Sequence, residues 1–161
     1  MFRPPPAFAE RRGHGTVSNV SFNRVPKLRG PGGALGLSAN ILLVDDSPTV
    51  RNILKIYLMN LKMGFVEAED ATRALQLLRL VPVKLVIADI NMPGMDGITF
   101  VKQVRASPLS QVRDVPVILL TGERGGDLRQ RGVEAGANAF INKPVSHHDL
   151  TETVRKFLTQ N

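Results

Sequence analysis

The chain has 161 residues, of which 43% are hydrophobic and 22% charged, and its formal net charge is +7. It contains no cysteine, which excludes a disulfide framework, a thiolate zinc site and a cysteine nucleophile, and no apolar run approaches the roughly 18 residues of a membrane span. These values predict one globular domain in the cytoplasm, while the positive charge raises the question of a nucleic-acid or acidic membrane partner.

The positive charge is concentrated in the first quarter of the chain. Residues 1–39 hold six basic residues and one acidic residue, and therefore contribute +5 of the +7. This segment is rich in proline and glycine and has no sustained apolar periodicity, which predicts a disordered basic arm, either a passive extension or a segment that binds a partner. Residues 40–161 carry only +2, so we expect a nearly balanced domain there and no nucleic-acid partner.

From Asn40 onward, short β-branched apolar runs alternate with longer segments of helical period. The pattern predicts strands at 41–45, 64–67, 84–89, 115–121 and 138–142, and helices at about 48–62, 70–81, 96–106, 127–135 and 147–159. Strands that are almost wholly apolar are typical of a parallel sheet with helices on both faces. The sequence therefore predicts an α/β fold, a doubly wound five-stranded parallel sheet with five helices.

Polar residues gather at the ends of the predicted strands, namely Asp45, Asp46, Asp89, Thr121 and Lys143. In a doubly wound sheet these ends meet in one crevice. Close carboxylates repel each other by up to about 4 kcal/mol per pair at an effective dielectric constant near 20, so the cluster needs a cation, and oxygen ligands favour Mg²⁺ or Mn²⁺ over zinc. A hydroxyl and an ammonium are donors for an anion, and a carboxylate is itself a nucleophile that can form an aspartyl phosphate.

Four motifs in order along the chain carry a resemblance to a known family. They are ILLVDD at 41–46, VIADINMPGMDG at 86–97, VILLTGE at 117–123 and GANAFINKP at 136–144. Over residues 40–160 the sequence resembles the receiver domain of two-component response regulators, and in particular its single-domain, CheY-like members. The resemblance implies the flavodoxin-like arrangement of this α/β fold.

The resemblance also implies a role for each residue of the cluster. Asp89 matches the aspartate that accepts the phosphoryl group. Asp45, Asp46, Asp89 and the backbone carbonyl of Asn91 match the Mg²⁺ ligands. Thr121 and Lys143 match the hydroxyl and the ammonium that contact the phosphoryl group, and the Lys143–Pro144 bond matches a cis peptide.

In this family a histidine kinase supplies the phosphoryl group, and the receiver catalyses only its own phosphorylation and dephosphorylation. The resemblance implies that Thr121 and Phe140 form a switch that changes the face made by the predicted helix at 127–135, the strand at 138–142 and the helix at 147–159, where a downstream protein binds. Phe140 lacks the hydroxyl of a tyrosine, so it cannot form a hydrogen-bonded version of this switch. The alternative is that Phe140 is simply an aromatic residue of the hydrophobic core. Asn91 and Glu123 match the positions that tune hydrolysis, and their residue types indicate a short-lived signal.

Several functional alternatives are compatible with the sequence. Because the chain ends directly after the last predicted helix, we expect a single-domain regulator that docks on a protein partner. A phosphorelay intermediate, a receiver cut from a larger protein and a phosphorylation-independent interaction module are the alternatives. An aspartyl phosphatase would need a second acid where Asn91 stands, and the residues available leave no room for a cap domain.

Overall fold

The computed structural model describes residues 40–122 and 126–159, so the predicted arm at 1–39 and Glu123 lie outside the described residues. The strands are β1 (Asn40–Val44), β2 (Gly64–Ala68), β3 (Val83–Asp89), β4 (Val117–Thr121) and β5 (Ala139–Asn142). The helices are α1 (Pro48–Leu58), α2 (Ala71–Leu80), α3 (Gly97–Arg105), α4 (Ser110–Arg113), α5 (Gly126–Ala135) and α6 (His147–Thr159), with a 3₁₀ turn at Met59–Leu61. None of these helices is long and apolar enough to cross a membrane.

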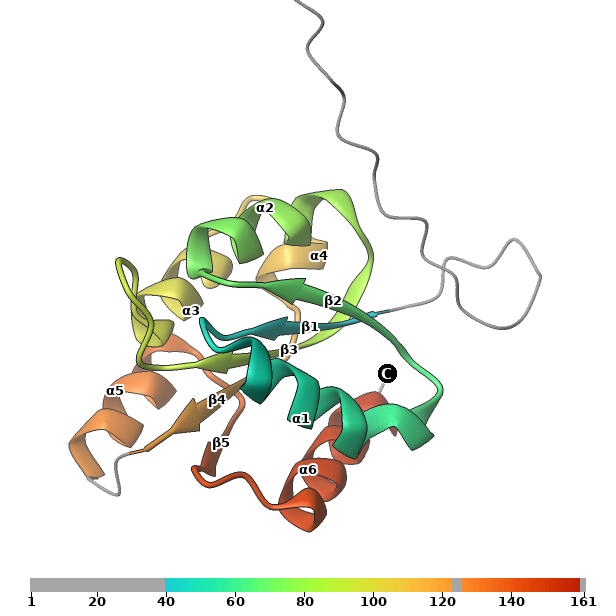
Figure 1. Cartoon of the computed structure of the whole chain (residues 1–161). Coiled ribbons are helices and arrows are strands. Elements are labelled where there is room, and N and C mark those ends of the chain that lie inside the picture. The colour runs from blue at the N-terminus through green and yellow to red at the C-terminus, as the bar shows by residue number, and fades with distance from the viewer. Residues whose placement is uncertain (1–39, 123–125, 160–161) are drawn as a thin grey trace, which may run out of the picture. The chain divides into compact units, whose positions relative to one another are not determined.

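The five strands form one parallel sheet in the order β2-β1-β3-β4-β5 (Figure 1). Helices cover both faces, α1 and α6 on one side and α2, α3, α4 and α5 on the other. Along β1, Ile41 and Leu43 belong to the core under α1 and α6, whereas Leu42 and Val44 belong to the core on the opposite face. Because both faces are covered, every residue of β1 is buried, which accounts for the continuous apolar run in the sequence. The predicted doubly wound fold is confirmed.

Most predicted boundaries lie within one residue of the observed ones, and larger differences occur at three places. The helix predicted at 48–62 ends at Leu58 and tightens into the 3₁₀ turn, which Lys62 terminates in the left-handed conformation with φ of 55°. The strand predicted at 115–121 starts at Val117, after a proline that has no N–H for the sheet ladder. The short helix α4 was not predicted, because its four residues are too few to show a helical period.

The strand order places a crevice at one edge of the sheet. After β1 the chain adds β2 on one side and then returns to add β3 on the other side. The helix after β1 therefore packs on one face of the sheet and the helix after β3 on the other. This divergence leaves space at the carboxyl ends of the two strands. Asp45 directly follows β1 and Asp89 ends β3, so the two predicted acidic positions flank this crevice.

Candidate functional site

Asp45 is fixed by main-chain and side-chain hydrogen bonds where β1 ends. Its N–H donates to the Ala68 carbonyl of β2 at 3.2 Å, and its Oδ1 accepts the Ser47 N–H at 2.8 Å. Ser47 in turn caps α1, because its hydroxyl oxygen accepts the Val50 N–H. The Asp45 residue is only 1% exposed, whereas the next residue, Asp46, is exposed. The chain thus presents one buried and one solvent-accessible carboxylate side by side.

Asp89 ends β3 and is 4% exposed. The loop that follows it is closed by hydrogen bonds: Ile90 N–H donates to the Leu120 carbonyl at 3.0 Å, and Gly97 N–H donates to the Ile90 carbonyl at 2.9 Å. These bonds tie the loop both to β4 and to the first turn of α3. The position of the Asp89 carboxylate is therefore set by two neighbouring elements as well as by its own strand.

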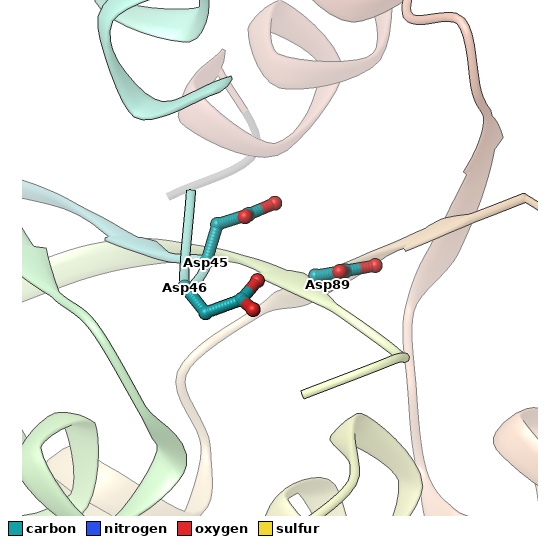
Figure 2. A group of neighbouring side chains, drawn as sticks. All are labelled: Asp45, Asp46 and Asp89. Carbon is teal, nitrogen blue, oxygen red and sulfur yellow. The ribbon is translucent and has the colours of Figure 1, made fainter. Parts of the chain in front are cut away.

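The three carboxylates converge at the crevice, as Figure 2 shows. One oxygen each of Asp45, Asp46 and Asp89 lie within 4.8 Å of one another. Within residues 40–122 and 126–159, Asp89 Oδ1 is one of two buried side-chain polar atoms that have no hydrogen-bond partner. A buried carboxylate oxygen without a partner has lost its hydrogen bonds to water and has no protein hydrogen bond in their place, which is unfavourable. The all-oxygen donor set and this unpartnered atom fit a divalent cation of the Mg²⁺ type.

Lys143 brings a positive charge to the same crevice from the loop after β5. Its Nζ lies 3.1 Å from Asp89 Oδ2 and 3.4 Å from Asp45 Oδ2, and its main-chain N–H donates to the Thr121 carbonyl at 2.7 Å. The Lys143–Pro144 peptide bond is cis, as the family resemblance implies. The ammonium bridges the two buried carboxylates and leaves Asp89 Oδ1 without a partner.

The balance of charge at the crevice favours an additional cation. Burial raises the pKa of Asp45, the Ser47 hydrogen bond and the Lys143 ammonium lower it, and the neighbouring Asp89 carboxylate raises it again. The net shift is upward, which means that the ionised form of Asp45 is less stable here than in water. Burial is the largest cause of this shift, and a divalent ion beside Asp45 would favour its ionised form.

The remaining predicted site residues occupy different surroundings. Thr121 ends β4, is 5% exposed and pairs in register with Asn142, next to Lys143. Asn91 is an exposed residue two positions after Asp89, and the role predicted for its carbonyl stays a prediction. Phe140, on β5, is half-buried and has the Arg129 guanidinium 5.4 Å from its ring centroid.

Two residues of this region were not singled out from the sequence. Gly97 packs its α-carbon against the main chain of Asp89 and Ile90, where an added methyl group would lie only 2.6 Å from the Asp89 carbonyl oxygen. The sequence does mark the position of Gly97, because it follows Asp96, and an aspartate directly before a helix is a typical N-cap. Arg51 donates to the Asp45 carbonyl, and no sequence signal distinguishes it from a solvated arginine on a helix.

The sequence is similar to those of several known proteins. The family model described as "Response regulator receiver domain" matches residues 41–155. The chain is 37% identical over 119 residues to chemotaxis protein CheY of Pseudomonas aeruginosa, covering 72% of this chain and 93% of that protein. It is 35% identical over 123 residues to chemotaxis protein CheY-3 of Vibrio cholerae, covering 76% of this chain and 93% of that protein.

A solved structure shows the same fold. The crystal structure of chemotaxis protein CheY4 of Vibrio cholerae superposes with a TM-score of 0.69 at 32% identity, and the match covers 74% of this chain and 98% of that one. The likeness thus extends over nearly the whole of that chain.

Proposed function

Because the chain belongs to the response regulator receiver domain family, we propose that it is a CheY-like signalling module that accepts a phosphoryl group on Asp89. The observation that carries the proposal is the state of the Asp89 carboxylate. One of its oxygens is bound by Lys143 at 3.1 Å, and the other is buried beside Asp45 and Asp46 without a hydrogen-bond partner. A carboxylate held in this way has one oxygen oriented by Lys143 and one that no protein group binds among the described residues, so a cation and a phosphoryl group can both be accommodated.

We propose that the phosphoryl donor is a phosphohistidine of a histidine kinase. In the transfer, the phosphorus–nitrogen bond of the donor breaks, a bond forms between phosphorus and an oxygen of Asp89, and the histidine ring keeps the released electron pair and takes up a proton. Asp45, Asp46 and Asp89, with the Asn91 carbonyl, would hold Mg²⁺, which supplies neutralisation of the negative charge that develops on the phosphoryl oxygens.

The chain's own residues act on the same charge. The Lys143 ammonium already lies between Asp45 and Asp89, so a phosphoryl oxygen on Asp89 would replace the Asp45 carboxylate as its partner. The Thr121 hydroxyl, on the strand next to β3, is proposed as a further donor to that group. The chain performs no chemistry on a separate substrate in this proposal, since phosphorylation and hydrolysis both occur on its own aspartate. Asn91 and Glu123 are proposed to keep the acyl phosphate short-lived.

The signal is proposed to leave through the surface of α5, β5 and α6, which corresponds to the predicted elements at 127–135, 138–142 and 147–159. Phe140 links two of these elements, because its ring on β5 lies directly against Gly132 of α5. A shift of Thr121 toward a phosphoryl group would give this ring a new position and change the surface that a downstream protein contacts. We place this exchange in the cytoplasm.

The test is phosphorylation of the full chain with acetyl phosphate, or its mimicry with beryllofluoride, in the presence of Mg²⁺. We expect intact-mass spectrometry to find one added phosphoryl group, which Asp89→Asn abolishes. Asp114→Asn is the matched control, because this carboxylate is exposed and its salt bridge is to the neighbouring Arg113, outside the acidic site. Amide spectra recorded with beryllofluoride should shift along α5, β5 and α6.

Two outcomes would contradict the proposal. Equal incorporation of phosphate into wild type and Asp89→Asn would move the acceptor elsewhere. No response of the wild-type chain to either reagent would favour the interaction module that works without phosphorylation.

A further inference from the structure

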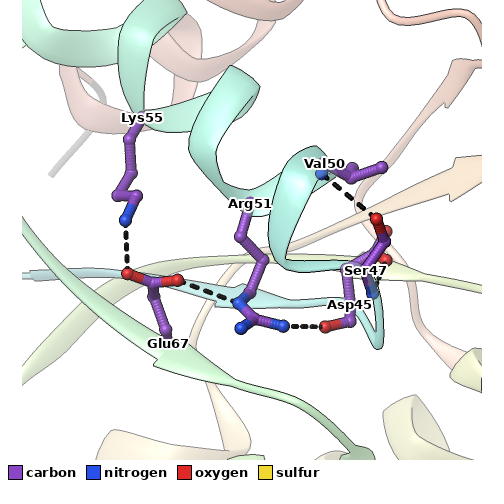
Figure 3. A network of polar contacts seen from close by, with 6 residues as sticks. All are labelled: Asp45, Ser47, Val50, Arg51, Lys55 and Glu67. Carbon is purple, nitrogen blue, oxygen red and sulfur yellow. Dashed lines mark hydrogen bonds and ion pairs between the residues drawn. The ribbon is translucent and has the colours of Figure 1, made fainter.

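Arg51 of α1 connects the acidic site to the neighbouring strand β2, as Figure 3 shows. Its Nη1 donates to the Asp45 main-chain carbonyl at 2.6 Å, and its Nε donates to Glu67 Oε2 at 2.9 Å. The Arg51 side chain is only 14% exposed, although it belongs to the first turns of a surface helix. A mostly buried guanidinium with two fixed acceptors has one preferred position.

The carbonyl that Arg51 holds belongs to the peptide unit between Asp45 and Asp46. A peptide unit is planar, so the direction of its carbonyl also determines the direction of the following N–H and α-carbon. The preceding peptide is fixed as well, because the Asp45 N–H donates to the Ala68 carbonyl. The hydrogen bond from Arg51 therefore sets the direction in which the chain leaves Asp45 and presents Asp46.

The Asp46 carboxylate depends on this constraint. It is exposed, and no hydrogen bond or ion pair to another residue of the described ranges holds it. The Asp45 carboxylate, by contrast, is bound by Ser47 and Lys143. Of the two acidic neighbours, the one without side-chain partners relies on the main chain for its orientation toward the crevice.

We propose that Arg51 is a positioning residue of the cation site: by holding the peptide plane between Asp45 and Asp46, it fixes the angle between their carboxylates and increases the affinity for a divalent cation. The inference rests on the proposed function, because it concerns the same acidic site. It assigns to Arg51 no contact with the ion or with the phosphoryl group.

Glu67 and Lys55 keep the guanidinium in place. Glu67 lies on β2 directly before Ala68, and its second carboxylate oxygen accepts a hydrogen bond from Lys55. Burial alone would raise the pKa of Glu67, but the hydrogen bonds from Lys55 and Arg51 outweigh it and hold the pKa below its ordinary value. Glu67 is thus a charged anchor for Arg51 at neutral pH.

Positioning and simple electrostatics predict opposite effects when Arg51 is removed. A positive charge near a cation site repels the ion, so the loss of that charge alone would tighten Mg²⁺ binding. The loss of a residue that orients metal ligands weakens binding, typically by about 10- to 100-fold for the groups behind the ligands. Lys55→Met is the matched control, because it removes the same charge from the same glutamate and leaves the Asp45 carbonyl untouched.

The experiment is a calorimetric titration of Mg²⁺ into the full chain and into Arg51→Met, Arg51→Lys and Lys55→Met. We expect Arg51→Met to weaken Mg²⁺ binding by about 10-fold or more. Lys55→Met should bind as the wild type does or more tightly. Arg51→Lys keeps the charge but lacks the planar guanidinium, whose Nε and Nη1 each meet one acceptor, so we expect an intermediate affinity. Thermal unfolding without Mg²⁺ establishes that each variant is folded.

The outcomes separate this inference from the proposed function. Unchanged or tighter Mg²⁺ binding by Arg51→Met overturns it. If that variant does not fold, Arg51→Lys decides in its place, and wild-type affinity overturns the inference because the charge is conserved. A wild-type chain that binds no divalent cation overturns both this inference and the proposed metal. A wild-type chain that binds Mg²⁺ and fails to become phosphorylated overturns only the proposed function.

Discussion

Gly97 shows how closely a single residue limits the geometry around Asp89. A methyl group there would lie 2.6 Å from the Asp89 carbonyl oxygen and 2.8 Å from the Ile90 α-carbon. Both are main-chain atoms, so neither moves away by changing a rotamer. The hydrogen bond from the Gly97 N–H to the Ile90 carbonyl depends on this close approach. The start of α3 and the end of β3 therefore form one rigid unit that carries the acceptor carboxylate.

We predict that Gly97→Ala lowers the free energy of unfolding by about 2 kcal/mol, because the added methyl group overpacks a site bounded by backbone. Urea denaturation measures the change. Gly126→Ala is the control, since its added methyl group meets no atom of residues 40–122 or 126–159 within 4 Å. Ordinary surface substitutions change the free energy of unfolding by no more than about 0.5 kcal/mol. A change within that range for Gly97→Ala would contradict the steric explanation.

At the level of elements, α5 and β5 are fitted to each other through Gly132 and Phe140. Interior glycines weaken a helix, by about 1 kcal/mol each relative to alanine. The structure explains why a glycine stands at position 132. A methyl group there would lie 2.6 Å from two ring atoms of Phe140 and 3.4 Å from Leu119 Cδ1. The glycine lets the helix approach the aromatic ring, and it couples the position of the ring to that of the helix.

This coupling predicts strong non-additivity. Gly132→Ala should destabilise the wild-type chain by about 1 kcal/mol, because the steric cost exceeds the gain in helix propensity. In a Phe140→Ala background the same change should be neutral or stabilise by up to about 1 kcal/mol, since the ring is gone. Chemical denaturation of the four proteins of this cycle gives the coupling. Additive effects would mean that the ring and the helix do not restrain each other.

The elements were largely predictable from the sequence, and the reasons are local. Apolar runs such as Leu85–Ala88 mark buried strands, and polar residues that end such runs must lie at one edge of a parallel sheet. The convergence of Asp45, Asp89 and Lys143 follows from this rule. The contacts of Arg51 do not follow from this rule, because they depend on how α1 packs beside β2. No sequence periodicity specifies that packing.

In the whole molecule, the edge of the sheet opposite the crevice is held by Arg105. Its guanidinium donates to the carbonyls of Gly136, Arg113 and Val115 at 3.0, 2.6 and 2.8 Å, and to Asn138 Oδ1 at 2.7 Å. These acceptors lie in the segments that lead into β4 and β5, so one side chain joins α3 to both strands. Arg105 thus stabilises the end of the sheet that lies away from the acidic site.

We predict that Arg105→Lys lowers the free energy of unfolding by about 2 kcal/mol, because one ammonium cannot reach four acceptors and leaves several without a donor. Mg²⁺ affinity should stay within about twofold of wild type, a change of less than about 0.5 kcal/mol. Thermal or urea unfolding and the Mg²⁺ titration measure the two quantities. Arg113→Lys is the control, since its exposed side chain pairs only with Asp114 among the described residues. A parallel loss of stability and of Mg²⁺ affinity would show that the two edges are not independent.

The bridge from Lys143 to Asp45 spans 98 residues of sequence. Synthesis proceeds from the N-terminus, so the carboxylates of β1 and β3 emerge from the ribosome well before the lysine that joins them. Until β5 is in place, the nascent crevice is a group of negative charges with no internal cation. The order of synthesis thus leaves the acceptor site incomplete until the loop after β5 has been made, when only α6 is still to follow.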